Sequence, residues 1–394
     1  MPDVIIVGAG IFGAATACFL AERGIRPLVL ERTSIAGGAT GWTSGIVRVH
    51  YTNPHEARLA LLSRTYFREW AERIGGSAGF QQTGFIRIVG VHDRDRLLEN
   101  ITMLRSLGTT VVFLEPDDLK QLQPSLAVDD VGGAAYEPEG GFAVGTDATS
   151  SLAARAVRLG AEIRQGVDVT ALRVERGRIA GVEVGAAFIP AGQVVVAAGA
   201  WSMTLLSRAG LDVPVRVKLI RAGLAEHAAG APVRHMTVYD DGIGTFFRPE
   251  RRNRTEFGLR YEWDVPPSHA SPPVPLEILA DGSRHLARRI PAISEAGLAR
   301  GWAAPDGFSA DGASIFGAVP GIEGLYVAIA GSGTGFKIGP AAGIGLAELL
   351  TEGRFLTVDL SAFRLTRFEE GALLQGSTDY RRPRWRDEPL SSAT

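Results

Sequence analysis

The N-terminal segment constrains the fold of this chain more than any other stretch. A short apolar run, Val4–Val7, is typical of a strand buried in a parallel sheet. The glycines that follow, Gly8, Gly10 and Gly13, have the spacing G-x-G-x-x-G, and a run of good helix formers comes next. A second apolar run then ends in Glu31. Strand, glycine turn, helix, strand and terminal acid in this order predict a βαβ unit that binds a dinucleotide.

Each residue of this unit has a physical task in such a site. Gly8 permits the tight turn from strand to helix, Gly10 lets the backbone approach a pyrophosphate, and Gly13 lets the helix pack closely on the strand. The N–H groups at the start of the helix would hold the phosphates. Glu31 stands at the tip of the second strand, where its carboxylate can accept hydrogen bonds from a ribose. The alternative, a glycine-rich turn without a ligand, is disfavoured because every element of the pattern is in register.

The composition excludes several classes of protein. The chain has 394 residues, 45% of them hydrophobic and 21% charged, which is typical of a folded protein with two domains. Its net charge of −2 gives no reason to expect binding to nucleic acid or to an anionic membrane. The single cysteine, Cys18, allows no disulfide within the chain and no thiolate metal cluster, and no metal is expected. We expect a cytoplasmic protein, because no signal peptide fits before the first strand and no apolar run could span a membrane.

The rest of the chain suggests two kinds of sheet. Apolar runs that are typical of parallel strands occur near both ends, at 4–7, 194–197 and 325–330. Between them, residues 213–257 are rich in β-branched and aromatic side chains broken by polar turns, which indicates antiparallel strands. A glycine-rich stretch follows the last apolar run, and a final helix is expected from about 339 to 350.

Four blocks of the sequence resemble, in this order, the D-amino-acid-oxidase-like family of flavoenzymes, in particular its monomeric sarcosine oxidase and glycine oxidase branch. The blocks are VIIVGAGIFGAATACFLAERG…VLE at 4–31, GGATGWTSGIVR at 37–48, VVVAAGAWS at 194–202 and DGASIFGAVPGIEGLYVAIAGSGTGFKIGPAAG at 311–343. The resemblance implies FAD as the cofactor. It also implies an α/β fold in which a Rossmann-like, glutathione-reductase-type FAD-binding domain is interleaved with a substrate domain built on a mixed or antiparallel β-sheet. The expected ranges are 1–80, 145–210 and 305–394 for the FAD-binding domain, and 81–144 and 211–304 for the substrate domain.

The resemblance further implies which residues surround FAD. They come from the first βαβ unit, the small-residue block at 37–48, the strand end at 194–202 and the glycine-rich loop at 331–337. Small side chains and N–H groups suit a loop that lies against a planar cofactor, and positive potential at a helix N-terminus would stabilise negative charge on the reduced ring. The expected cofactor-binding residues are Gly8, Gly10, Ile11, Phe12, Gly13, Glu31, Arg32, Ala39, Thr40, Thr43, Ser44, Val169, Ala198, Gly199, Trp201, Gly331, Gly333, Thr334, Gly335, Phe336 and Lys337.

Two cations carry the chemistry that the resemblance implies. In sarcosine-oxidase-like enzymes, the residues that match Lys337 and Arg48 clamp the carboxylate of the substrate. Lys337 is one of only three lysines in the chain, and it falls on the motif. Phe246 and Arg260 align near positions of the substrate pocket, and Tyr51 is expected beside Arg48.

The chain departs from the pattern of this family at two places. Some relatives attach FAD covalently through a cysteine before the fourth block or a histidine in the second, whereas this chain has no cysteine at 300–304 and has Trp42 at the histidine position. We therefore expect noncovalent FAD. Sarcosine oxidase also places a lysine above the flavin for its reaction with oxygen. The matching position falls near Glu256 without a lysine beside it. The electron acceptor, O2 or another molecule, thus stays open, as does a role for Arg260 as the cation that assists oxygen.

The expected activity is oxidation of the C–N bond of an amino acid or an N-alkyl amino acid, such as a sarcosine-like secondary amine, to an imine by hydride transfer to FAD. Two alternatives remain. The first is a dehydrogenase of a 2-hydroxy acid or polyol, which needs a base such as a histidine beside the flavin. The second is a FAD-bearing subunit that is active only in a larger complex. Action on a modified base in RNA is disfavoured by the net charge of −2.

Overall fold

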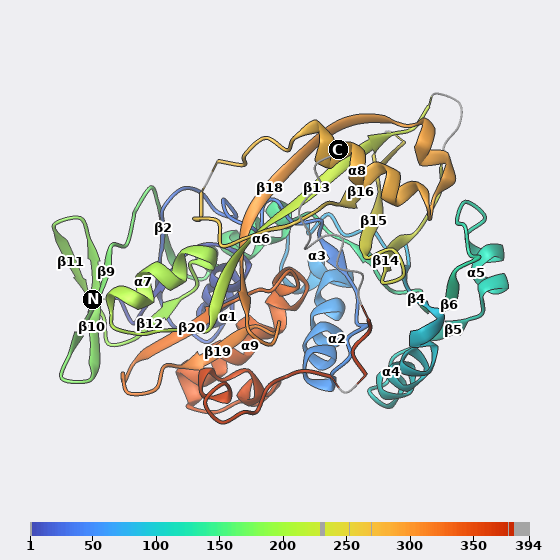
Figure 1. Ribbon diagram of the computed structural model, residues 1–394. Coiled ribbons are helices and arrows are strands. Elements are labelled where there is room, and N and C mark those ends of the chain that lie inside the picture. Colours follow the sequence, from blue (N-terminus) through green and yellow to red (C-terminus); the bar gives the residue numbers. More distant parts are fainter. Residues whose placement is uncertain (1, 229–232, 252, 269, 377, 382–394) are drawn as a thin grey trace.

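Two large β-sheets organise the part of the chain that the structure describes, which is residues 2–381 except 229–232, 252, 269 and 377 (Figure 1). The structure is a computed structural model. The end of the expected FAD-binding domain, 382–394, lies outside the described residues. The fold is a mixed α/β fold, as the sequence predicts. No helix in the described part of the chain is both long and apolar enough to cross a membrane.

The first sheet has six strands in the order β19-β20-β12-β1-β2-β8. Neighbouring strands are parallel except for β19 and β20, which are antiparallel. The all-apolar strand β1 lies between β12 and β2 and is buried along its whole length, because a central parallel strand is covered on both faces. The strands are β1 (Val4–Val7), β2 (Pro27–Glu31), β8 (Glu162–Gln165), β12 (Val194–Val196), β19 (Ile315–Ala318) and β20 (Leu325–Ile329).

Successive residues of β1 face two different layers, because side chains alternate along a strand. Ile6 packs with apolar residues of three helices, whereas Ile5 and Val7 pack on the other face with a small sheet and a short helix. The helical layer consists of α1 (Ile11–Glu22), α6 (Gly145–Arg158) and α9 (Gly335–Glu352). The opposite layer consists of β9 (Ala171–Glu175), β10 (Arg178–Val184), β11 (Ala187–Pro190) and α7 (Ser202–Arg208).

The second sheet has nine strands in the order β17-β13-β16-β15-β14-β4-β6-β5, and β18 pairs with β13. All its pairs are antiparallel except β14 with β4. The long strands β13 and β18 run side by side through the middle of the molecule (Figure 1). The strands are β4 (Phe85–Gly90), β5 (Val112–Leu114), β6 (Val131–Glu137), β13 (Val215–Glu226), β14 (Thr237–Asp240), β15 (Thr245–Glu250), β16 (Arg254–Gly258), β17 (Glu262–Trp263) and β18 (Gly297–Ser309).

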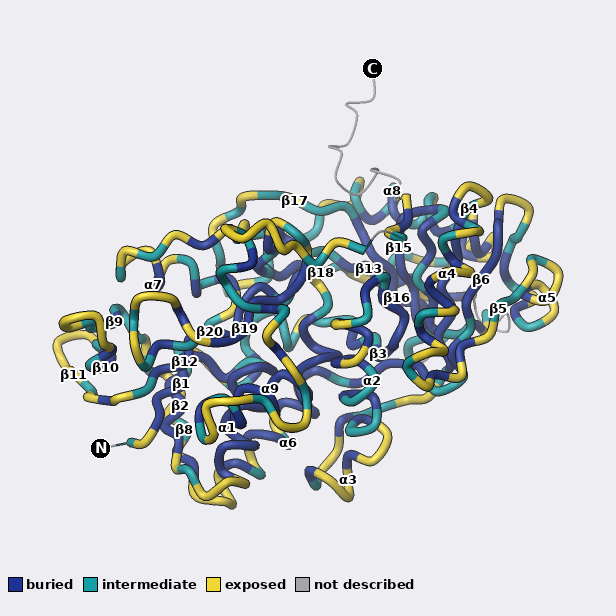
Figure 2. The backbone as a smooth tube through the Cα atoms, turned by 90° about the horizontal axis from the view of Figure 1, so that it is seen from below, coloured by how far each residue is buried: buried dark blue, intermediate teal, exposed yellow. Residues whose placement is uncertain are grey.

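Shorter elements connect and cover the sheets. Helix α8 packs on the second sheet through Leu279 and Leu286, and α2 packs against α9. Exposed residues gather at the two ends of the molecule, in the β9–β11 sheet and around α5 (Figure 2). These elements are β3 (Ile46–Val47), β7 (Gly141–Phe142), α2 (Pro54–Arg68), α3 (Trp70–Arg73), α4 (Arg94–Ser106), α5 (Pro116–Leu122) and α8 (Leu276–Ala287). Single 3₁₀ turns are η1 (Val91–Asp93), η2 (Gly199–Trp201), η3 (Pro291–Glu295), η4 (Ser361–Phe363) and η5 (Leu365–Arg367).

Helix α9 begins four residues earlier than the sequence predicts, at Gly335 instead of about 339. Its glycines serve helix packing rather than a loop. A Cβ atom on Gly335 would lie 2.9 Å from the ring of Phe12, and one on Gly339 would lie 2.3 Å from Ile11 Cγ1. The glycines therefore let α9 approach α1 closely. Their number favours a loop when the sequence alone is considered, and this is why the predicted helix starts too late.

The division into two domains stays a prediction. All strands of the first sheet fall inside the ranges expected for the FAD-binding domain. Those of the second sheet fall inside the ranges expected for the substrate domain, except that β18 crosses the boundary at residue 304. The sequence did not predict β18, because its glycines and Pro305 break the strand pattern. Pro305 is tolerated because β18 pairs with β13 alone among the described strands and so forms an edge.

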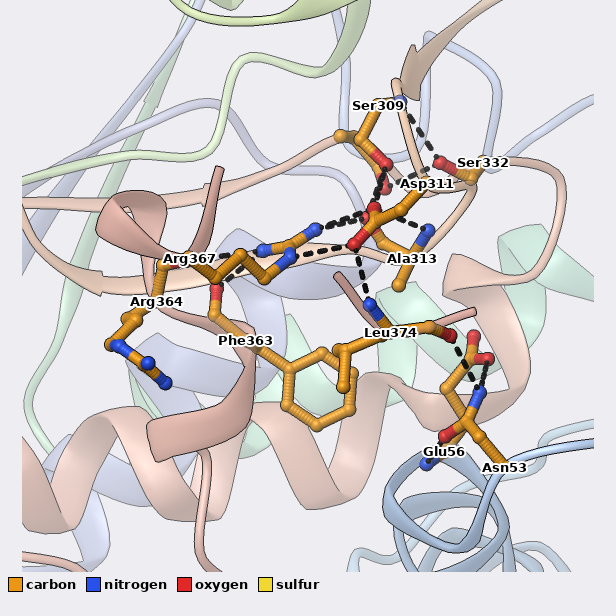
Figure 3. Close-up of polar contacts among 11 residues, drawn as sticks. Asn53, Glu56, Ser309, Asp311, Ala313, Ser332, Phe363, Arg364, Arg367 and Leu374 are labelled. Carbon is orange, nitrogen blue, oxygen red and sulfur yellow. Dashed lines mark hydrogen bonds and ion pairs between the residues drawn. The ribbon is translucent and has the colours of Figure 1, made fainter. Parts of the chain in front are cut away.

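A buried ion pair ties the C-terminal segment to the loop before β19 (Figure 3). The guanidinium of Arg367 donates to both carboxylate oxygens of Asp311 at 2.8 Å, and both side chains are inaccessible to solvent. The backbone N–H of Leu374 donates to the same carboxylate at 3.0 Å. Burial by itself would raise the pKa of Asp311, but the hydrogen bonds from Arg367 and Leu374 and the charge of Arg367 outweigh it and lower the pKa to about 2.

We predict that Arg367→Met destabilises the protein by about 3–5 kcal/mol, because it leaves the Asp311 carboxylate buried and unpaired. Urea unfolding at pH 7 measures the loss. The matched control is Arg364→Met, which removes an exposed pair with Glu370 and should cost about 0–1 kcal/mol. Since Asp311 has a lowered pKa, its contribution is complete above its ordinary pKa of 3.8 and is lost as the pH falls through about 2. Equal losses for the two variants would contradict the prediction.

Candidate active site

A cavity of about 490 Å³ is lined by both large sheets. From the first sheet it takes the carboxyl ends of β1, β2 and β20, where open parallel sheets bind their ligands. From the second sheet it takes residues of β13, β14, β15 and β18. All the predicted cofactor-binding residues line this cavity except Gly13. Their contacts with FAD stay predictions.

The glycine turn between β1 and α1 is built as the motif requires. Gly8 has a φ of +104°, and a Cβ atom there would lie 2.5 Å from the carbonyl oxygen of Ala197. A Cβ atom on Gly13 would lie 2.0 Å from the carbonyl oxygen of Gly8, so Gly13 serves close packing of α1 behind the turn. Gly10 lines the cavity at the N-terminus of α1, whose first turn contains no acidic residue. A phosphate can therefore approach this helix end without repulsion.

Glu31 marks one end of the cavity. Its Oε2 accepts a hydrogen bond from the N–H of Ala9 at 2.8 Å, and its Oε1 accepts one from the N–H of Thr33 at 2.8 Å. Both bonds hold the Glu31 carboxylate in place at the tip of β2. The guanidinium of Arg32 lies 4.8 Å from the centre of the Trp201 ring, and Val169 lines the same end. The charged side chains of Glu31 and Arg32 and the flat ring of Trp201 thus occur together where the ribose and adenine are expected.

The small-residue block lies along the middle of the cavity. Thr40 Oγ1 accepts a hydrogen bond from the N–H of Ile11 at 3.1 Å, which ties the block to the start of α1. Ala39, Thr40, Thr43 and Ser44 all line the wall. Trp302 Nε1 donates to the carbonyl oxygen of Trp42 at 3.2 Å, and both tryptophans line the cavity.

A strained loop leads from β20 into α9. Ala330 and Ser332 have φ values of +57° and +49°, and Gly333 has +72°. Two contacts to β18 hold the loop in place. The N–H of Ser332 donates to the carbonyl oxygen of Gly307 at 2.9 Å, and the N–H of Gly333 donates to Asp306 Oδ2 at 2.8 Å. The loop delivers the N-terminus of α9 to the cavity, with Gly331, Gly333, Thr334, Gly335, Phe336 and Lys337 in its wall.

Arg48 and Lys337 are two buried cations in the same wall. Arg48 donates to the carbonyl oxygen of His50 and lies over the ring of Tyr51, 4.4 Å from its centre. Lys337 Nζ donates to the carbonyl oxygen of Thr334 at 3.4 Å. Within the described part of the chain, neither cation has a carboxylate at ion-pair distance. Burial lowers the pKa of both, and the charge of Arg48 lowers that of Lys337 further.

A buried carboxylate partly offsets these two charges from the first turn of α2. Glu56 Oε2 accepts a hydrogen bond from Asn53 Nδ2 at 2.5 Å, and Figure 3 shows the two side chains together. Burial raises the pKa of Glu56 to about 7, although the charges of Arg48 and Lys337 act in the opposite direction. The site therefore keeps an excess of positive potential when Glu56 is protonated.

Two of the three predicted pocket residues do not line the cavity. Phe246 on β15 does line it. Tyr51 does not, because it lies beneath the Arg48 guanidinium. Arg260 does not, because its Nε donates to Asp281 Oδ2 at 2.6 Å on helix α8. A role for Arg260 in the reaction with oxygen stays a prediction.

Sequence analysis missed five charged residues that the structure places in the cavity wall, namely Asp168, Arg208, Lys218, Asp241 and Asp306. Two of them lie on the long paired strands of the second sheet. Lys218 lies on β13, with its Nζ 4.0 Å from the centre of the Tyr261 ring and 3.9 Å from a Trp263 ring centre. Asp306 lies opposite it on β18. The scarcity of lysine was a signal for Lys218, whereas nothing in the local sequence marks Asp306.

The residues present fit FAD. The cavity runs from an acidic strand tip, past a glycine turn at a helix N-terminus, to a second helix N-terminus with two cations. A Cβ atom on Gly10 would lie 3.3 Å from Thr40 Oγ1, within the cavity wall, so the missing side chain keeps room for a phosphate. The described residues contain no group of three or more His, Cys, Asp or Glu side chains arranged to hold a metal ion.

Comparison with known proteins agrees with this geometry. A family model described as "FAD dependent oxidoreductase" (DAO) matches residues 3–349. The chain is 28% identical to glycine oxidase of Geobacillus kaustophilus over 379 residues, which covers 93% of this chain and 97% of that protein. It is 30% identical to sarcosine oxidase subunit beta of Rhizobium meliloti over 385 residues, which covers 94% of this chain and 89% of that protein.

A solved structure agrees as well. The crystal structure of L-proline dehydrogenase from P. horikoshii superposes with a TM-score of 0.86 at 25% identity, covering 94% of this chain and 99% of that one. Family model, relatives and fold together identify the cofactor as FAD. The chain belongs to the FAD-dependent oxidoreductase (DAO) family.

Proposed function

We propose that this protein oxidises the C–N bond of an amino acid or N-alkyl amino acid to an imine. The observation that carries the proposal is the pair of buried cations, Arg48 and Lys337, in one cavity wall without a carboxylate partner in the described part of the chain. A buried charge without a counter-ion is unfavourable. The carboxylate of an amino acid would supply the missing negative charge.

Each cation has a distinct task in this proposal. Arg48 is held by the His50 carbonyl and the Tyr51 ring, so its remaining N–H donors can fix the orientation of a carboxylate. Lys337 lies in the first turn of α9, where its charge adds to the positive end of the helix dipole. When bound, FAD supplies a ring that accepts two electrons and a hydrogen from the carbon next to nitrogen. The chain's residues position that carbon and shield it from water.

The similar proteins support this substrate class by their names, which refer to glycine, sarcosine and L-proline. The hydroxy-acid alternative needs a base such as a histidine beside the flavin. No described histidine lines the cavity, and His50 Nε2 is bonded to the hydroxyl of Tyr380 at 2.6 Å. The lack of a histidine among the described residues of the cavity wall therefore favours an amine substrate, which can lose its proton without one.

Anaerobic mixing of the FAD-loaded protein with a panel of amino acids, N-methyl amino acids and 2-hydroxy acids tests the proposal. Bleaching of the flavin absorbance by amino acids, and not by their hydroxy analogues, is the expected result. Bleaching by hydroxy acids alone would overturn the proposal. A flavin that no member of the panel reduces would favour a subunit that is active only in a larger complex.

We further propose that FAD is bound noncovalently, since residues 300–304 contain no cysteine and Trp42 replaces the expected histidine. Acid precipitation of the yellow protein should release all its flavin as FAD into the supernatant. The absorbance of supernatant and pellet measures this. Flavin that remains with the pellet would show a covalent bond, and release of NAD in its place would remove the basis of the whole assignment.

Glu31→Ala should weaken FAD binding about tenfold to a hundredfold, because one charge-assisted hydrogen-bond pair is worth about 1.5–3 kcal/mol. Turnover at saturating FAD should change little, because Glu31 ends β2, which β1 and β12 separate in the sheet from β20 and the loop that leads to Lys337. Fluorescence titration of the apoprotein with FAD measures the dissociation constant. Glu162→Ala on the neighbouring strand β8 is the control, since Glu162 does not line the cavity. An unchanged dissociation constant in Glu31→Ala would remove Glu31 from the site.

Lys337→Met should lower kcat/KM by about tenfold to a hundredfold or more, because a charge-assisted contact to the substrate is worth about 1.5–3 kcal/mol. The midpoint potential of the flavin should fall too, since a nearby cation favours added negative charge. Arg48→Met should weaken carboxylate binding with less effect on the potential. Lys120→Met removes an exposed lysine outside the cavity and serves as the control. If a decarboxylated amine is oxidised by the wild type as well as its parent acid, the two cations do not hold a carboxylate.

A further inference from the structure

Asp306 is a carboxylate in the cavity wall to which the proposed carboxylate clamp gives no task. It lies on β18 directly opposite Lys218 of β13, and its Oδ2 accepts the N–H of Gly333 from the loop before α9. The long β13–β18 pair therefore carries Asp306 to the part of the cavity where α9 delivers Lys337. An acid and a buried cation thus share one end of the cavity.

The charges around Asp306 come from two elements. Lys337 faces it from α9 and Lys218 faces it from β13, and the backbone N–H groups of Gly307 and Gly333 donate to it. Burial is the largest influence and raises the pKa of Asp306 to about 6, although all four of these groups act in the opposite direction. Asp306 is therefore ionised at neutral pH, yet its pKa lies close enough to neutrality for it to accept a proton readily.

Asp306 differs from Asp241, another carboxylate in the cavity wall. Both carboxylate oxygens of Asp241 are bound by the buried guanidinium of Arg87. No cation in the described part of the chain lies within ion-pair distance of Asp306. Asp306 thus offers a negative charge to a ligand, whereas Asp241 is already neutralised.

We propose that Asp306 binds the ammonium group of the substrate and accepts its proton. The proposal rests on the proposed function, since an amino acid is a zwitterion whose carboxylate would lie between Arg48 and Lys337. Its ammonium group, one carbon away, then meets Asp306. The N–H bond breaks and an O–H bond forms on Asp306. The lone pair left on nitrogen can then form the C=N bond when the C–H bond breaks, and bound FAD would accept the hydrogen with its two electrons as a hydride.

Asp306→Asn tests this step while sparing the loop. The amide oxygen of asparagine can still accept the N–H of Gly333, but the side chain can neither carry charge nor take a proton. In the wild type, kcat/KM should fall as the pH drops through about 6, because Asp306 must be ionised to receive the ammonium group. In the variant the limb near pH 6 should be replaced by one at the pKa of the substrate amine, because only the neutral amine can then react. The kcat/KM of the variant should be about 100-fold to 10,000-fold lower at pH 7 and rise tenfold per pH unit up to the pKa of the substrate amine.

Three controls separate proton transfer from support of the loop. Ser332→Ala loosens the same loop, because Ser332 Oγ accepts the N–H of Ser309 at 3.3 Å, but it leaves the carboxylate in place. Its pH profile should keep the acidic limb whatever its kcat. An N-trifluoroethyl substrate, whose amine is neutral at pH 7, should restore much of the activity lost in Asp306→Asn. Anaerobic stopped-flow with an indicator dye should show a proton released before flavin reduction in the variant, and only with product release in the wild type.

The outcomes are distinct. An acidic limb near pH 6 that survives in Asp306→Asn would overturn the inference and leave Asp306 as a support of the loop. The same conclusion follows if the trifluoroethyl substrate restores nothing. Both results presuppose that an amino acid reduces the wild-type flavin. If none does, the proposed function fails first, and Asp306 has no ammonium group to receive.

Discussion

The close contact between α1 and its neighbours is the constraint on which the rest of the structure depends. Nearly every residue of α1 is buried, because the helix is enclosed by the first sheet, α6 and α9. Glycines make this possible, with Gly13 set against the turn at Gly8 and Gly339 set against Ile11. The packing brings the N-termini of α1 and α9 to the same cavity. Two positive helix ends therefore converge on one ligand, which suits a cofactor that carries phosphates at one end and gains electrons at the other.

The electrostatics of the site follow from burial. Arg48 and Lys337 lie in the wall with lowered pKa values, mainly because burial disfavours their charged forms. The charge of Arg87 lowers the pKa of Arg48 further, and the charge of Arg48 lowers that of Lys337. Glu56 and Asp306 have raised pKa values for the same reason of burial. These four residues come from the segments before and within α2, from α9 and from β18. Arg48, Lys337 and Asp306 line the cavity, whereas Glu56 does not. The fold thus brings buried charges of both signs to the cavity wall, where a zwitterionic ligand can pair with both.

Pairing of β13 with β18 joins the two parts of this system. β18 ends close to the loop before α9, and it holds that loop through Gly307 and Asp306. The same strand pair places Lys218 among aromatic rings in the cavity. The substrate side of the cavity is therefore built by the second sheet but anchored to the loop that carries Lys337. This arrangement couples the position of the cation in α9 to the sheet that would surround the substrate.

The sequence by itself determined the βαβ unit, the family and the end of the cavity that Glu31 marks. Those features are local, since the spacing of Gly8, Gly10 and Gly13 and the apolar strands on either side follow from neighbouring residues. It also placed Lys337, through a motif that continues into a helix. The tertiary structure alone decided that Asp306 and Lys218 face the cavity, and that Arg260 turns away to Asp281. Strand β18 contains glycines and a proline that hide its pattern, and its register with β13 spans about 80 residues of sequence. Which side chains of such a pair point into a cavity depends on that register, and no local pattern encodes it.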